Sequence, residues 1–226
     1  MNKKLLIIFL LIVLVTSIFV ISKRNENNNI MEMGDGNMVI SCVGDSITYG
    51  YGLKDRKDSW VFLLPKLLGE DYKTINYGLV GATLLSSGDI PYFNSNIALE
   101  FNKKDTDKII FMLGSNDSKN INWNKNKFSE EYNQIVDKFI DKVGRDNLYI
   151  MTPPKIFLKS SSEEDANNDN LKEAYDIIID IGNNKNVNVI DLYKYSENHK
   201  DWYSDGLHLN KKGNKEVAKI ISKYLK

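Results

Sequence analysis

Short apolar runs alternate along this chain with longer stretches whose apolar residues recur at helical spacing, which restricts the possible folds more than any other feature. Five runs are rich in aliphatic, β-branched or aromatic residues, as is typical of buried strands: 38–43, 74–77, 108–113, 148–151 and 187–190. Strands that alternate with helices form a mainly parallel sheet covered on both faces. We therefore predict an α/β fold, a three-layer α/β/α sandwich around a central, mostly parallel five-stranded sheet.

Three later stretches carry apolar residues on one helical face: 128–143, 171–181 and 217–225. Gly144 and Gly182 follow the first two stretches, and glycine is the usual residue just beyond a helix C-terminus. We therefore expect these two helices to end there. A further stretch, 59–69, has helical spacing, but we expect Pro65 to kink or shorten it.

Length and composition exclude several classes of protein. A chain of 226 residues allows one globular domain, or at most two very small ones. The 30 Lys and Arg residues balance 30 Asp and Glu residues, which argues against a nucleic-acid binder. Cys42 is the one cysteine, which excludes a disulfide framework and a multi-cysteine zinc site. We expect Cys42 to be a buried apolar filler, and we expect neither a metal nor a cofactor.

The first residues form a separate unit. Residues 5–21 are an unbroken run of 17 apolar or small residues with basic residues on both sides. That length lies between a membrane-spanning helix and the core of a signal peptide. The apolar residues continue past the small residues at 15–17, so we favour an uncleaved signal anchor over a removed signal peptide for 1–24. The absence of a polar face argues against a buried core helix.

The remaining chain divides into a linker and a folded domain. Residues 25–37 contain three consecutive asparagines and two glycines, which indicates a flexible tether before a domain at 38–226. Without residues 1–24 the chain has 26 basic and 30 acidic residues, a net charge of −4, which offers no attraction to anionic lipid. We expect the domain to lie on the extracellular face of the membrane, anchored by the N-terminal helix, or to be secreted.

Four polar clusters follow predicted strands or precede the last helix: 44–48, 76–83, 114–117 and 205–208. In parallel sheets, sites gather at the carboxyl ends of the strands. Ser46 lies on a tight turn that opens a helix, where its backbone N–H is free to bind an anion. The Asn116 amide can stabilise developing negative charge. Each cluster alone is also ordinary turn chemistry.

Asp205 precedes His208 by three residues, a spacing that lets the carboxylate orient the imidazole and stabilise its charge. A hydrolytic serine needs such a base. The other histidine, His199, has no comparable partner upstream, and we expect it to lie in a solvated loop.

In order, the motifs GDSIT, NYGLVGAT, GSND and DGLH resemble the SGNH hydrolases, also called the GDSL esterase/lipase family, over almost everything from Val39 to Leu225. The resemblance implies a flavodoxin-like arrangement of the sheet. It implies Ser46 as the nucleophile and His208 as the base, with Asp205 orienting His208. Leu209 departs from the family, which often has proline after this histidine.

The same resemblance implies an oxyanion hole made by the Ser46 and Gly81 backbone N–H groups and the Asn116 amide. Gly81 is preferred to Gly78 because the family's Asn-x-x-x-x-Gly spacing begins at Asn76. Asp45 and Asp117 look like supports that hold these loops by hydrogen bonds.

Residues 81–92, 112–123 and 152–154 look like a bacterial branch of carbohydrate acetylesterases or lysophospholipase-like proteins. This implies a serine esterase that acts on small acyl esters, with an O-acetyl group on a sugar as the expected substrate. Tyr92 and Trp123 could stack on a sugar ring, or could simply pack within their loops. A lysophospholipase or thioesterase for longer acyl chains, transfer of the acyl group to another sugar, and a non-catalytic carbohydrate-binding module remain alternatives.

Overall fold

The structure, a computed structural model, describes residues 30–158, 162 and 165–226. The predicted signal anchor or signal peptide at 1–24, and residues 25–29 of the predicted tether, lie outside the described residues. Within the described part of the chain, no helix is long and apolar enough to cross a membrane. The extracellular placement of the domain therefore stays a prediction.

A mixed sheet of six strands forms the middle layer, in the order β1-β3-β2-β4-β5-β6. The strands are β1 (Met31–Met33), β2 (Met38–Gly44), β3 (Tyr72–Gly78), β4 (Lys108–Met112), β5 (Leu148–Met151) and β6 (Asn188–Ile190). The five strands from β2 to β6 correspond to the predicted runs and are parallel, while β1 is antiparallel to β3. The predicted number of five strands is wrong, because β1 lies in the segment expected to be a flexible tether.

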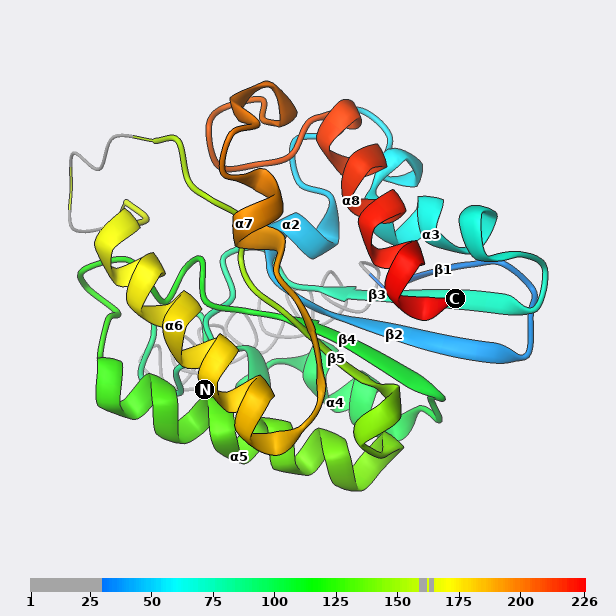
Figure 1. Ribbon diagram of the computed structural model, residues 1–226, viewed down its shortest axis with the longest axis horizontal. Coiled ribbons are helices and arrows are strands. Elements are labelled where there is room, and N and C mark those ends of the chain that lie inside the picture. Colours follow the sequence, from blue (N-terminus) through cyan, green and yellow to red (C-terminus); the bar gives the residue numbers. More distant parts are fainter. Residues whose placement is uncertain (1–29, 159–161, 163–164) are drawn as a thin grey trace, which may run out of the picture.

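Helices cover both faces of this sheet, as Figure 1 shows. One face carries α4 (Asn96–Lys103), α5 (Lys125–Val143) and α6 (Asn168–Lys185), and the other carries α2 (Ser46–Tyr49), α3 (Trp60–Leu68), α7 (Leu192–Ser196) and α8 (Lys211–Leu225). Short 3₁₀ helices are η1 (Arg56–Asp58), η2 (Tyr92–Asn94), η3 (Arg145–Asn147) and η4 (Lys200–Trp202). Successive residues of β2 alternate between the two cores: Val43 packs with α4, α5 and α6, whereas Ile40 and Cys42 pack with α3 and α8. The predicted three-layer sandwich is confirmed.

The predicted end of one helix differs in the structure. Helix α5 ends at Gly144 as expected, but α6 continues past Gly182 to Lys185. Gly182 serves close packing and does not end the helix, since a Cβ there would approach Cγ2 of Val189 to 2.2 Å. The helix ends instead at Asn186, which adopts the left-handed conformation with φ 52°.

Pro65 lies inside α3 without ending it. Proline has no N–H, so the carbonyl of Val61, four residues earlier, loses its usual helical donor. The hydroxyl of Thr74 on β3 replaces that donor, with Oγ1 2.8 Å from the Val61 oxygen in a fully buried position. A strand side chain thus completes the hydrogen bonding of the helix that packs on it.

We predict that Thr74→Val destabilises the protein by about 1–3 kcal/mol, because it leaves the buried Val61 carbonyl without a donor at nearly constant side-chain volume. Urea unfolding followed by circular dichroism measures the effect. In a Pro65→Ala background the new N–H of residue 65 can serve the same carbonyl, so Thr74→Val should cost clearly less there. Equal losses in the two backgrounds would contradict this account.

Candidate active site

The four polar clusters meet at the carboxyl ends of β2, β3 and β4. The Leu79 N–H donates to the Gly44 oxygen at 2.9 Å, which joins the loop after β3 to the loop after β2. The Asn116 side-chain amide donates to the Ala82 oxygen at 3.0 Å, which joins the loop after β4 to the same region. The expectation from parallel-sheet geometry, that these clusters converge, is therefore met.

Ser46, His208 and Asp205 form one chain of hydrogen bonds. Nε2 of His208 lies 3.1 Å from Oγ of Ser46, and Nδ1 of His208 lies 2.7 Å from Oδ2 of Asp205. The other carboxylate oxygen of Asp205 accepts the backbone N–H groups of Leu207 and His208 at 2.9 and 2.7 Å. The side chain and the local turn therefore fix the orientation of the imidazole together.

The environment of Asp205 keeps its carboxylate charged. Partial burial acts to raise the pKa of Asp205, but the hydrogen bonds from the His208 ring and from the His208 and Leu207 N–H groups outweigh it, so this pKa is lowered. An ionised carboxylate at this position stabilises a protonated imidazole. The His208 side chain is 15% exposed, whereas that of Asp205 is 50% exposed, so water screens the carboxylate more than the imidazole.

The start of α2, which Asp45 caps, leaves the Ser46 backbone N–H free to donate. Asp45 is the N-cap of this four-residue helix, and its Oδ1 accepts the Ile47 N–H at 2.9 Å. Ser46 is the first helical residue, so its own N–H has no intrahelical acceptor, and it donates to no other group among the described residues. Both the Ser46 hydroxyl and its N–H are thus available at one position.

Gly78 and Gly81, at the end of β3 and in the loop after it, differ in the hydrogen bonding of their backbone N–H groups. The Gly78 N–H is already committed to Oδ1 of Asn76 at 2.9 Å, and a Cβ at Gly78 would lie 2.2 Å from the Tyr49 nitrogen. Gly78 therefore allows the close approach of α2. Gly81 has φ +78°, and its N–H has no acceptor among the described residues. Hydrogen bonding thus favours Gly81 over Gly78 as a donor to an oxyanion.

Asn116 is held so that one of its amide hydrogens remains available. It is buried to 8% exposure, and Nδ2 donates one hydrogen to the Ala82 oxygen. No second acceptor for Nδ2 exists within the described part of the chain, which leaves one N–H to donate to a ligand.

Two fully buried carboxyl groups support these loops, as the family resemblance implied for Asp45 and Asp117. Asp117 accepts the backbone N–H groups of Leu84 and Leu85 at 2.9 and 2.8 Å, which fixes the segment after Gly81. Burial raises the pKa of Asp45 to about 6 and that of Asp117 to about 7, against the hydrogen bonds that each accepts. Neither group is exposed to a substrate, so their contacts are those of loop supports.

The two aromatic residues expected near a sugar have different positions. Tyr92 is fully buried, and its hydroxyl donates to the Tyr77 oxygen at 2.7 Å. Of the two alternatives for Tyr92, the structure contradicts a contact with substrate and supports packing, because the ring is part of the core beneath the loop. Trp123 is partly buried and donates its ring N–H to Glu173 on α6 at 3.0 Å. A contact between Trp123 and substrate stays a prediction.

Sequence reasoning missed Tyr51, whose ring lies beside the imidazole. Its centroid is 4.6 Å from that of His208 at an interplanar angle of 50°, and the residue is 48% exposed. Gly50 and Gly52 flank it, both at positive φ, so the chain turns sharply and directs the ring outward. An aromatic residue between two glycines, five residues after the candidate nucleophile, is the signal that could have identified it.

Comparisons with known proteins identify a family for this chain. The family model of the GDSL-like lipase/acylhydrolases matches residues 40–221. The chain is 28% identical to an acetylxylan esterase of Xylanibacter ruminicola, over 83% of this chain and 43% of that protein. This chain therefore spans less than half the length of that curated relative.

Two solved structures share the fold. A lipase/acylhydrolase from Enterococcus faecalis has a TM-score of 0.65 at 23% identity, covering 83% of this chain and 95% of that one. A carbohydrate acetylesterase from Sinorhizobium meliloti has a TM-score of 0.65 at 18% identity, covering 84% and 98%. The family model spans the structure from β2 into α8 and includes all four polar clusters. This chain belongs to the GDSL-like lipase/acylhydrolase family.

Proposed function

We propose that this chain is a serine esterase that hydrolyses small acyl esters, with O-acetyl groups on a carbohydrate as its substrates. The observation that carries the proposal is the chain of hydrogen bonds from Ser46 through His208 to Asp205, at 3.1 and 2.7 Å. Family membership supports ester hydrolysis, and the similarity to an acetylxylan esterase supports an acetyl group on a sugar.

In the proposed acylation step, Oγ of Ser46 attacks the ester carbonyl while Nε2 of His208 accepts the hydroxyl proton. Asp205 stays ionised and stabilises the resulting imidazolium through Nδ1. The Ser46 and Gly81 N–H groups and the free amide hydrogen of Asn116 donate to the oxyanion. The protonated His208 then gives its proton to the departing alcohol, which leaves an acyl group on Ser46.

The proposed second step uses the same residues in reverse. Water replaces the alcohol, and His208 removes a proton from it as it attacks the acyl carbonyl. The oxyanion forms again at the same three donors; its collapse breaks the bond between the acyl carbon and Oγ, and His208 returns the proton to Oγ as the acid leaves. The described residues therefore provide every proton transfer in the cycle.

Tyr51 is the best-placed residue to hold a sugar. Its exposed ring lies next to His208, and an aromatic face packs well on the apolar face of a pyranose. We propose that Tyr51, in place of the buried Tyr92, is the aromatic contact for the carbohydrate that carries the ester.

Replacing Ser46 by alanine should lower kcat for p-nitrophenyl acetate by at least about 10³-fold, because no other hydroxyl of the described residues is paired with His208. Ser129→Ala, on α5 at the opposite face of the sheet, is the matched control and should keep full activity. Circular dichroism establishes that both variants are folded. A folded and active Ser46→Ala enzyme would refute the assignment of the nucleophile.

Asn116→Ala should lower kcat by roughly 10²-fold, with a much smaller change in KM, because the lost N–H acts on the developing oxyanion. Steady-state kinetics on p-nitrophenyl acetate separates the two parameters. The substitution also removes the hydrogen bond to Ala82, so urea unfolding is measured alongside. A loss confined to stability, with full kcat, would remove Asn116 from the oxyanion hole.

For Tyr51→Ala, the loss in kcat/KM on acetylated xylo-oligosaccharides should exceed the loss on p-nitrophenyl acetate by roughly 3–10-fold, since only the sugar uses the ring face. Tyr51→Phe keeps the ring and should preserve the preference for the sugar substrate. Equal losses on the two substrates in Tyr51→Ala would show that the ring only packs against His208.

A further inference from the structure

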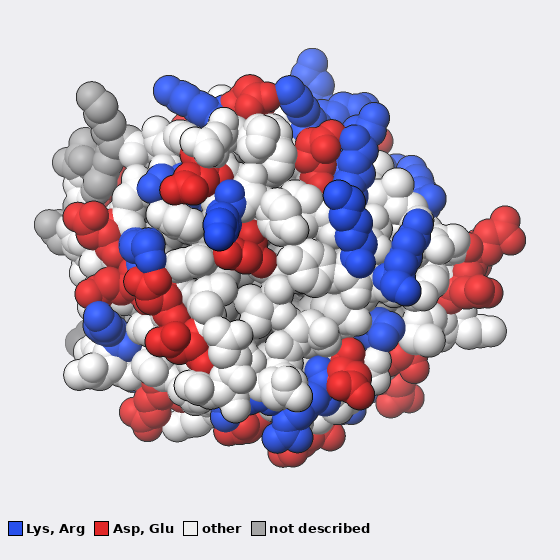
Figure 2. Space-filling model, viewed as in Figure 1, with Lys and Arg blue, Asp and Glu red and all other residues white. Residues whose placement is uncertain are grey.

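A row of lysines runs along one face of α8. Lys211, Lys215, Lys219 and Lys223 recur at every fourth residue, and all four are exposed. Residues four apart share a helix face and are about 6 Å apart along the axis, so the row extends over about 18 Å. Figure 2 shows Lys and Arg side chains gathered over the region of α8 and α3. We call these four residues the lysine row.

The lysine row borders a groove of about 350 Å³ between α8 and α3. Leu63 and Leu67 of α3 provide apolar lining, and Leu67 is 37% exposed. Lys66 faces the row from the α3 side, and Asp58 is the acidic residue of the lining. An apolar floor with cations on both sides suits a ligand that is amphipathic and anionic.

The positive charge of this face exceeds what its own carboxylates neutralise. Lys211 pairs with Asp58 at 2.9 Å, and Lys219 pairs with Glu216 at 2.8 Å. Lys66, Lys215 and Lys223 form no ion pair with any described residue. Residues 211–226 contain six lysines and one glutamate, whereas residues 30–226 contain 26 basic and 29 acidic residues. The face is therefore strongly positive on a domain with a net negative charge.

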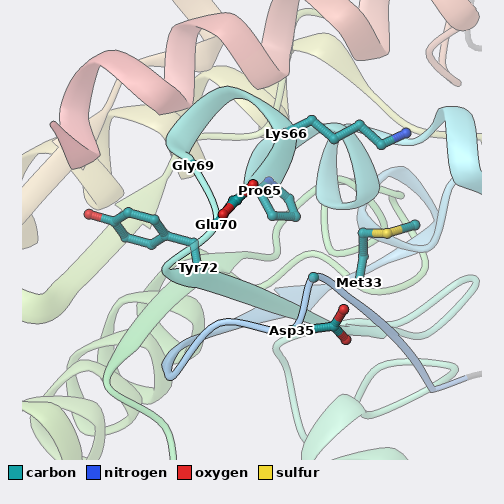
Figure 3. Close-up of a pocket in the computed structure, with 8 residues that line it drawn as sticks. Met33, Asp35, Pro65, Lys66, Gly69, Glu70 and Tyr72 are labelled. Atoms are coloured by element: carbon teal, nitrogen blue, oxygen red, sulfur yellow. The ribbon is translucent and has the colours of Figure 1, made fainter.

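One end of the lysine row lies close to His208 in the chain. Lys211 opens α8 only three residues after His208, and its partner Asp58 lies in η1, close in sequence to Tyr51. A chain-like ligand on the row can therefore continue toward Ser46. A second cavity of about 570 Å³ near the end of α3 is lined by Asp35 and Glu70 and also by Lys66 (Figure 3). Its two carboxylates outnumber its one lysine, so the lysine row is the more favourable of the two places for an anion.

We propose that the lysine row and its groove bind an anionic polysaccharide, so that the ester cleaved at Ser46 is carried on a polymer with acidic groups along its length. This inference rests on the proposed function and specifies its substrate class. Lysine ammonium groups bind such anions as point charges, and sugar rings pack on Leu63, Leu67 and the lysine stems. An anionic lipid surface would contact the same charges, but a flat surface would not enter the groove between α8 and α3.

The test compares an acidic with a neutral polymer. In the full-length chain, Lys215→Gln/Lys219→Gln/Lys223→Gln should lower kcat/KM for acetylated pectin about tenfold, because each exposed ion pair contributes about 1.5- to 5-fold. Activity on acetylated glucomannan and p-nitrophenyl acetate should change less than about twofold. The matched control, Lys127→Gln/Lys138→Gln/Lys142→Gln on α5, removes the same charge from the opposite face and should retain activity on pectin.

A binding measurement separates this inference from the esterase proposal. The Ser46→Ala variant, which cannot cleave the ester, should bind pectin in isothermal titration calorimetry. Adding the α8 triple substitution should weaken that binding, and so should a rise in salt from about 0.05 to about 0.5 M. Pectin binding that depends on these lysines and on salt supports the proposed role of the lysine row even if no ester is cleaved. Unchanged pectin kinetics and binding in the α8 variant would overturn the inference while leaving the esterase intact. Loss confined to binding of phosphatidylglycerol vesicles would also overturn it, in favour of a membrane contact.

Discussion

The hydrogen bond between Ser46 and His208 is the contact on which the site depends, and it joins residues 162 positions apart in the chain. Sequence distance makes this contact costly in entropy, so other elements must hold both ends. Asn214 provides one such link: its Oδ1 accepts the Trp60 N–H at 3.0 Å, and its Nδ2 donates to the Leu209 oxygen at 3.0 Å. The start of α3, the start of α8 and the loop carrying His208 are thereby fixed to each other.

The other end of that contact is held by buried polar side chains. Asn76 donates to the Thr48 oxygen at 2.8 Å, Asp45 caps α2, and Asp117 fixes the loop after Gly81. Burying such groups is costly unless they are hydrogen-bonded, and here each one fixes a backbone segment of the site. The raised pKa values of Asp45 and Asp117 show how strongly burial acts on them. Burying these polar groups thus lowers the stability of the fold, while their hydrogen bonds make the loops around Ser46 rigid.

The features that sequence predicted well have strong local signals. The strands β2 to β6 are short apolar runs, and the polar clusters that follow them lie where a parallel sheet brings its carboxyl ends together. The features it missed depend on tertiary contacts. Strand β1 has three residues in a segment whose asparagines and glycines resemble a tether, and Gly182 is required by its close approach to Val189, not by a helix end. Whether Tyr92 or Tyr51 is exposed depends on the depth of each ring in the fold, which local sequence does not encode.

Covalent labelling by a fluorophosphonate tests the central claim most directly, because the reagent modifies a serine hydroxyl only where a base activates it and donors stabilise the adduct. The account predicts a single adduct, located on Ser46 by peptide mass spectrometry. It also predicts that labelling is lost in a folded His208→Ala variant, because Nε2 of His208 is the group hydrogen-bonded to Ser46. No adduct on Ser46, or undiminished labelling without His208, would contradict the account.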